Sequence, residues 1–284
     1  MKISIALCEG THDIAFISKI LYSFGFESYE NSISGFPKPL NQLFLTIFNN
    51  EKISDRKLGF HEDSYLIPRA SLIKDNHLIL FHNMNSDTTT KPRYDVIDQY
   101  NKLFGSKANL FIQGAVEIET EYILFYDADE LGIEGRVDFI KDNFCSKYSI
   151  DEKKVEHGVK MDCSGFKFGC YVFHDEVSKK GTLERQLNNM FKCGCIENTN
   201  LINNAEEFVD NNILNKERCR KYSPGTDSYV KSSRFSREKA IISVVGQTQF
   251  SGASNSVIIA NSDFIKKNDI INDQKCKEIF SLFQ

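Results

Sequence analysis

The sequence lacks several features that would assign a class of protein at once. It contains no tryptophan, so 23 phenylalanines and 11 tyrosines must supply the large core side chains. No apolar run approaches the ~20 residues of a membrane-spanning helix, and we expect no membrane association. Lys and Arg number 35 against 39 Asp and Glu, and the resulting net charge of −4 argues against a surface that binds a polyanion everywhere. The G-x-x-x-x-G-K-[ST] loop of P-loop ATPases is also missing.

The cysteines and the N-terminus bear on the cellular compartment. Eight cysteines in a 284-residue chain without a signal sequence are expected to stay reduced. The opening, MKISIALCEG, has too short an apolar stretch for a signal peptide. Cys193 and Cys195, with Cys163 and Cys170 upstream, fit no common zinc-ligand spacing. We therefore expect a cytoplasmic protein with free thiols.

Apolar strand patterns alternate with helical patterns along the sequence. The predicted strands are residues 2–8, 64–67, 77–82, 121–127 and 166–175. The predicted helices are residues 11–25, which Thr11 is expected to cap, and residues 40–50, 94–104, 136–144, 182–192, 205–222 and 273–283, with Gly132 and Gly135 in an acidic turn before the fourth of them. This alternation is typical of an α/β fold with a mostly parallel central sheet flanked by helices.

We interpret residues 1–284 as a single α/β domain. Residues 31–120 show no motif and are expected to form an insertion or extra elements of the sheet. Residues 196–284 are expected to form a C-terminal extension of helical or βα type.

Carboxylates follow two of the predicted strands. The stretch ILFYDADE runs four apolar or aromatic residues directly into three acidic ones, with Asp127 and Asp129 two residues apart. Glu9 ends the first strand, and Asp13 lies on the first turn of the following helix. In a parallel sheet these acids share the edge where ligands bind, and four such charges repel one another unless a cation lies among them. Oxygen ligands favour Mg²⁺ or Mn²⁺ at this place.

The order and spacing of these residues resemble the Toprim domain of topoisomerases, bacterial primases, recombination proteins and OLD-type nucleases. That domain reads strand-E-G-x-x-D-helix and then strand-D-x-D-x-x-G-helix. The matching residues are Glu9, Gly10 and Asp13, followed by Asp127, Asp129 and Gly132. The resemblance covers residues 1–30 and 120–195, and it implies a core of about four parallel strands. About ninety residues separate the two motifs, more than a minimal Toprim core needs.

The resemblance implies Mg²⁺-dependent phosphoryl transfer, with a nuclease acting on DNA or RNA as the first hypothesis. Asp127 and Asp129 would hold the metal, and Glu9 would bind it or act as a general acid or base. Asp13 would support the metal site. Glu184, in a G-T-L-E segment similar to one in OLD-type proteins, would add a further carboxylate. A solvated turn and an exposed helix residue are the plain alternatives for these acids.

A second group of residues would contact the substrate. The helix start after Gly10 is expected to bind phosphate oxygens. Residues 218–239 mix basic and aromatic side chains, as strand-binding segments do, although an ordinary solvated linker reads the same way. The basic residues assigned to this role are Arg220, Lys221, Arg234 and Lys239.

Two alternatives to a nuclease stay open. A non-catalytic module that binds metal, nucleotide or nucleic acid would suit the net charge of −4. A hydrolase of nucleotides or other small phosphates would suit it slightly better. His12 and Asp175 lie near the same predicted edge, His12 without an assigned role and Asp175 as an outer ligand. The sequence leaves open a homo-oligomer or a protein partner.

Overall fold

A seven-stranded mixed sheet forms the centre of the part of the chain that the structure describes. This structure is a computed structural model, and it describes residues 1–29, 32–50, 65–85, 89–104, 118–213 and 236–284. The strands are β1 (Lys2–Cys8), β2 (Glu27–Ser28), β3 (Ala70–Lys74), β4 (His77–Asn83), β5 (Glu119–Asp127), β6 (Lys160–Asp162) and β7 (Lys167–Phe173). Their order across the sheet is β2-β3-β4-β1-β5-β7-β6. The four central strands, β4, β1, β5 and β7, are parallel; β3 pairs antiparallel with β4, β6 antiparallel with β7, and β2 antiparallel with β3.

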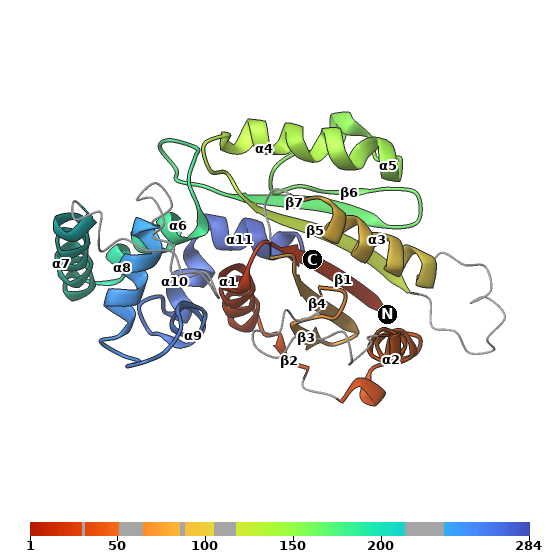
Figure 1. Cartoon of the computed structure of the whole chain (residues 1–284), viewed down its shortest axis with the longest axis horizontal. Helices are drawn as coiled ribbons and strands as arrows, with labels where there is room; N and C mark the ends of the chain where they lie inside the picture. Colours follow the sequence, from red (N-terminus) through yellow and green to blue (C-terminus); the bar gives the residue numbers. More distant parts are fainter. Residues whose placement is uncertain (30–31, 51–64, 86–88, 105–117, 214–235) are drawn as a thin grey trace, which may run out of the picture.

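Helices cover both faces of this sheet (Figure 1). Those before β7 are α1 (Thr11–Ser23), α2 (Leu40–Asn50), α3 (Lys91–Phe104), α4 (Gly132–Ile140) and α5 (Ser146–Tyr148). Those after it are α6 (Leu183–Gly194), α7 (Ile196–Ile213), α8 (Arg237–Gly246), α9 (Asn255–Asn261), α10 (Lys267–Asn272) and α11 (Gln274–Ser281). Every described element after residue 195 is helical. Figure 1 shows α6–α10 gathered beyond the carboxyl ends of the parallel strands.

Two apolar cores, one on each face, hold these layers together. Side chains alternate along a strand, so Ile5 and Leu7 of β1 pack with α2, α3 and α4, while Ala6 and Cys8 pack with α1 and the C-terminal helices. The central strands are apolar along both faces, as expected for parallel strands covered by helices on each side. The predicted α/β class with a mostly parallel central sheet is therefore confirmed for the described residues.

Several local predictions need correction. Residues 65–67 form a turn, and the strand lies at β3 instead, where ASLIK shows only weak alternation. The polar composition of residues 85–93 predicts an exposed loop, but residues 91–93 begin α3. Gly10, in extended conformation, is the N-cap of α1 in place of Thr11. Residues 214–222, the end of the predicted helix 205–222, lie outside the described residues.

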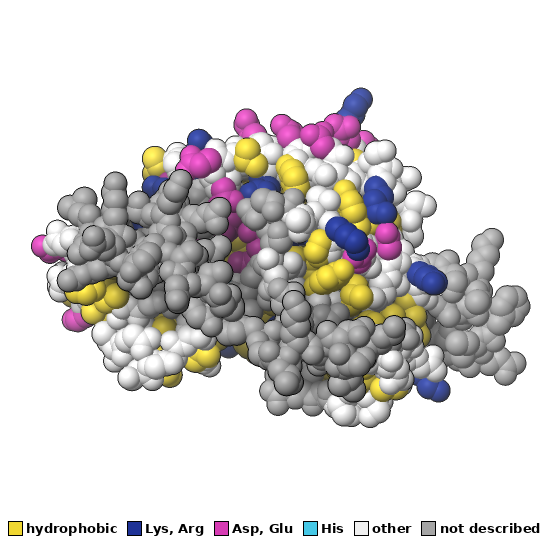
Figure 2. Space-filling model, viewed as in Figure 1, with side chains coloured by type: hydrophobic (Ala, Val, Ile, Leu, Met, Phe, Trp, Pro, Cys, Tyr) yellow, Lys and Arg dark blue, Asp and Glu magenta, His cyan; other side chains and the backbone are white. Residues whose placement is uncertain are grey.

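Charge is unevenly distributed over the surface. On the face shown in Figure 2, acidic side chains gather along the edge where Figure 1 places α4 and α5, and Lys and Arg are scattered. Glu134 and Asp138 are among the exposed acids of α4. The part of this face that the structure describes therefore offers a polyanion no broad basic surface. Within the described residues no helix combines the length and the apolar character required to span a bilayer.

Candidate active site

Glu9 and Asp127 meet at the carboxyl ends of β1 and β5. These strands are parallel neighbours, with Ala6 opposite Ile123 and Leu7 opposite Leu124, so the prediction that they lie side by side is confirmed. Beyond the last pair, the Asp127 backbone N–H donates to Glu9 Oε1 at 3.1 Å. This hydrogen bond joins the two predicted motifs directly.

Asp13 closes the first turn of α1. Its Oδ2 accepts a hydrogen bond from the Gly10 backbone N–H at 3.0 Å, and the residue is only 6% exposed. Burial raises the pKa of Asp13 to about 6, partly offset by the Gly10 hydrogen bond and reinforced by the charge of Glu184. The N–H of Gly10 expected to bind phosphate is therefore already occupied by a carboxylate.

The pKa shifts show that these acids act on one another. Burial, followed by the charge of Asp13, raises the pKa of Glu9 to about 8. Burial, followed by the charges of Asp13, Glu9 and Glu184, raises the pKa of Asp127 well above its ordinary value. Four carboxyl groups from three separate segments thus share one electrostatic environment. We call Glu9, Asp13, Asp127 and Glu184 the acid cluster.

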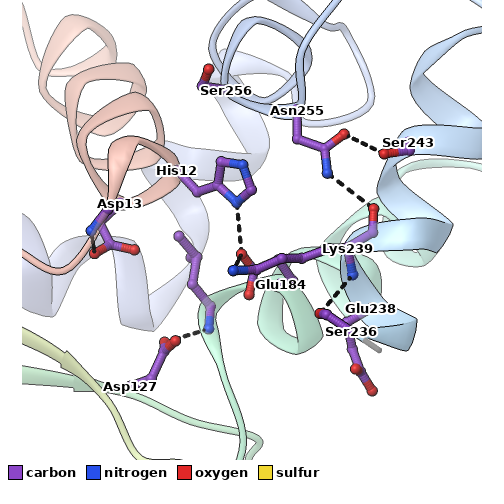
Figure 3. A network of polar contacts seen from close by, with 12 residues as sticks. His12, Asp13, Asp127, Glu184, Ser236, Glu238, Lys239, Ser243, Asn255 and Ser256 are labelled. Atoms are coloured by element: carbon purple, nitrogen blue, oxygen red, sulfur yellow. Dashed lines mark hydrogen bonds and ion pairs between the residues drawn. The ribbon is translucent and has the colours of Figure 1, made fainter. Parts of the chain in front are cut away.

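The start of α6 brings Glu184 to the cluster. Asp127 Oδ1 accepts a hydrogen bond from the Leu183 backbone N–H at 2.8 Å, which fixes the helix start against the end of β5. Glu184 Oε1 lies 2.7 Å from His12 Nδ1 and 3.5 Å from Lys239 Nζ (Figure 3). Burial alone would raise the pKa of Glu184, but the His12 hydrogen bond and the Lys239 charge lower it to about 2. Glu184 therefore stays ionised.

Glu184 also has an unused hydrogen-bonding position. Its side chain is only 3% exposed, and its Oε2 is buried without a hydrogen-bond partner in the described part of the chain. A buried acceptor on an ionised carboxylate is costly unless a donor or a cation satisfies it.

Lys239 supplies the positive charge nearest to Glu184 among the described residues. Ser236 caps the start of α8 by accepting from the Lys239 backbone N–H, and Asn255 Nδ2 donates to the Lys239 carbonyl at 3.0 Å (Figure 3). Burial lowers the pKa of Lys239, but the charges of Glu184, Asp127 and Asp13 raise it above its ordinary value. The structure thus places this predicted substrate-binding residue at the acid cluster.

Asp129 lies apart from the acid cluster. Two acids two residues apart point to the same side only in an extended chain. Asp129 instead has a φ of +45°, and its N–H and carbonyl both bond to Gly181. Its Oδ2 accepts from Arg136 NH2 at 2.8 Å, while Arg136 Nε donates to the Asp127 carbonyl at 2.9 Å. The two aspartates therefore have different partners: Asp127 Oδ1 accepts from the Leu183 backbone N–H, and Asp129 Oδ2 accepts from Arg136.

The remaining predicted residues are placed as follows. Asp175 accepts hydrogen bonds from Val177 and Ser178 within its own loop, which hold its pKa below the usual value. It belongs to that turn rather than to the acid cluster. Arg220, Lys221 and Arg234 lie outside the described residues. Gly132 has a φ of +74° at the start of α4, a conformation that favours glycine.

Two arginines beneath the cluster were not predicted from the sequence. Arg93 is fully buried, its guanidinium 4.1 Å from the ring centroid of Tyr126, and Arg136 is also buried. Both lower the pKa of Glu9, though less than burial and Asp13 raise it. Arg93 lies in the polar stretch interpreted as a loop, and nothing in the residues around it indicates that its side chain is buried.

The carboxylates fit a hard divalent cation in chemistry but are not gathered around one point. Mg²⁺ and Mn²⁺ prefer oxygen ligands, and every member of the acid cluster offers them. However, in the described part of the chain no three His, Cys, Asp or Glu side chains are close enough to hold a metal ion as they stand. The buried, unpartnered Glu184 Oε2 is the atom of the cluster that a cation would satisfy. Several of these carboxylates could hold one cation only after turning toward one another.

Comparisons with known proteins do not assign the chain to a family. No family model matches the sequence, and no curated protein is similar to it. Among solved structures, a hypothetical protein from Pyrococcus horikoshii OT3 aligns over 100% of this chain and 94% of its own, with 16% identity and a TM-score of 0.46.

Proposed function

We propose that the protein is a Mg²⁺- or Mn²⁺-dependent phosphoryl-transfer enzyme of the Toprim type, and that it hydrolyses phosphodiester bonds of DNA or RNA. The observation that carries the proposal is the acid cluster at the carboxyl ends of adjacent parallel strands. Such edges are where α/β sheets bind their ligands. Carboxylates whose pKa values are raised by burial and by one another are typical of functional sites, because a stable fold gains nothing from them.

Glu9, Asp13, Asp127 and Glu184 would hold the divalent cation. When bound, the cation neutralises phosphate charge and lowers the pKa of a coordinated water. Asp129 would join these ligands only after releasing Arg136. The ionised Glu184 and the hydrogen-bonded Asp127 are already held in place by α6, whereas Asp13 would have to give up the Gly10 N–H.

Glu9, Lys239 and Gly10 would handle proton exchange and phosphate binding. Glu9, with a pKa of about 8, carries a proton at neutral pH without the cation, and it would act as the general acid or base if the other three carboxylates hold the cation. Lys239 presents a half-exposed ammonium group beside the carboxylates, where it would pair with a phosphate oxygen. If Gly10 is released by Asp13, its N–H becomes available to the phosphate at the start of α1.

The test is a hydrolysis assay with purified protein, Mg²⁺ or Mn²⁺, and four substrates: single-stranded DNA, duplex DNA, RNA and nucleoside triphosphates. We expect Glu9→Gln or Asp127→Asn to abolish cleavage of the preferred substrate, with circular dichroism unchanged. Glu130→Gln is the matched control, because this acid belongs to the same DADE turn but its side chain is 97% exposed. Full activity in either cluster variant would contradict the assignment.

The same assay separates the two alternatives. Turnover of nucleoside triphosphates without cleavage of nucleic acid would indicate a small-phosphate hydrolase, which the net charge of −4 favours. Binding without any turnover would indicate a non-catalytic module. A nuclease that holds several phosphates should lose affinity steeply as salt rises, because bound counterions are released.

A further inference from the structure

A cavity is lined in part by Gln186, Asn189 and Met190 of α6, the helix whose start carries Glu184. It has a volume of about 450 Å³, within the usual range for small-molecule sites. Its walls come from α6, from the loop after β7, and from α10 with the residues on either side of it. Met190 and Ile265 give it an apolar surface, and most of its other side chains are charged.

The charges on its walls do not balance. Four acids face one lysine, Lys275. Glu176 pairs with this lysine at 3.7 Å, and Asp175 pairs with Arg185, also at 3.7 Å.

The other two acids, Asp269 and Asp273, form no ion pair within the part of the chain that the structure describes. Each instead accepts a backbone N–H as a helix cap, Asp269 from Lys266 at 2.9 Å and Asp273 from Cys276 at 2.8 Å. Asp273 directly follows α10, its backbone N–H donates to the Asp269 carbonyl at 2.9 Å, and both residues line the cavity, so this wall carries two negative charges without an ion pair.

A buried amide adds an independent sign of a missing ligand. Gln186 lines the cavity and is only 2% exposed, yet neither its Oε1 nor its Nε2 has a hydrogen-bond partner among the described residues. The neighbouring Tyr171 hydroxyl can satisfy at most one of these two atoms. A native fold rarely leaves such an amide unsatisfied, because each unpaired buried group costs free energy.

We propose that this cavity binds a small organic cation of the diamine class. The ammonium charge would be balanced by Asp269 and Asp273, and the methylene chain would pack against Met190 and Ile265. The buried amide of Gln186 would have to turn toward the cavity to accept an N–H from the ligand. A phosphate or carboxylate ligand is disfavoured by the acidic wall. A bare metal ion would leave the apolar surface and most of the volume unused.

Calorimetric titration of the full-length protein with putrescine tests the proposal, with 1,4-butanediol as a neutral isostere and MgCl₂ as a metal control. We expect saturable binding of putrescine and none of the diol. Asp269→Asn and Asp273→Asn together should weaken binding about tenfold or more, because asparagine keeps the helix caps but removes the charges. Gln186→Leu should weaken it about threefold or more while leaving the protein folded. Glu207→Gln, on the exposed surface of α7, is the control variant and should bind as the wild type does.

Each outcome decides the question. Absence of saturable binding, equal binding of the diol, or unchanged affinity in the double aspartate variant would overturn the proposal. Binding of Mg²⁺ that competes with putrescine and is lost in the same variant would also overturn it in favour of a metal site. None of these results depends on nuclease activity, so the two proposals fail or succeed separately.

Discussion

The buried acids at the two ends of the central strand β5 differ in whether lysines neutralise them. At its amino end, Glu121 is fully buried but has Lys160 Nζ at 2.7 Å, Lys2 Nζ at 3.1 Å and the Ser4 hydroxyl at 2.7 Å. At its carboxyl end, Asp127 forms no ion pair in the described part of the chain; its Oδ1 accepts only the Leu183 backbone N–H, and the charges of Asp13, Glu9 and Glu184 add to burial in raising its pKa. The contrast shows that this fold can neutralise a buried carboxylate with lysines when structure alone is at stake. We take the contrast between Glu121 and Asp127 as support for the proposed cation at the acid cluster.

The largest effect is expected from removing the lysines at the amino end. In Lys2→Met/Lys160→Met, Glu121 becomes a buried charge without a cation, and the free energy of unfolding should fall by about 3–5 kcal/mol. Urea denaturation followed by circular dichroism measures this loss. Adding Glu121→Gln should restore at least half of it. A loss below about 1 kcal/mol would mean that the two ends of β5 are less different than their contacts indicate.

At the carboxyl end of β5, removing a charge is expected to raise the free energy of unfolding rather than lower it. The pKa of Glu9 rises from an ordinary 4.5 to about 8 in the folded protein, so the unfolded chain releases this proton first. Without divalent cations, stability should therefore fall as pH rises from about 4.5 to about 8, and change little through this group outside that window. Glu9→Gln should flatten this slope and stabilise the protein at pH 7.5 by about 1–3 kcal/mol.

Urea denaturation across this pH range, with EDTA present, checks the prediction for Glu9. Glu130→Gln should behave as the wild type. If Glu9→Gln destabilises the protein at every pH, then Glu9 is not strained by its acidic neighbours and the contrast between the two ends fails.

A smaller effect distinguishes the two aspartates of the DADE turn. Asp129→Asn removes a partly exposed ion pair with Arg136 and should cost about 0.5 kcal/mol of stability. Its effect on Mn²⁺ affinity, measured by calorimetry, should be less than about threefold, whereas Asp127→Asn should lower the affinity at least tenfold. An equal loss in both variants would show that Asp129 leaves Arg136 to bind the metal.

The sequence predicted correctly which residues strand order brings together. It did not predict the contacts that depend on the direction of individual side chains. Glu9 and Asp127 were expected together because each ends an apolar strand, and neighbouring parallel strands end at one edge. Nothing in the sequence around Asp129 signals its left-handed backbone, so its turn toward Arg136 was missed. The pairing of Lys239 with Glu184 joins residues 55 positions apart, and only the packing of α6 against α8 reveals it.

The outermost strands of the sheet have a consequence for how the protein behaves at high concentration. β2 has two residues and β6 three, so each border of the sheet presents few free backbone donors and acceptors to another molecule. Short border strands are a common protection against edge-to-edge aggregation. Seven strands with many apolar residues can thus remain dispersed, and any self-association should occur through helices rather than by extending the sheet.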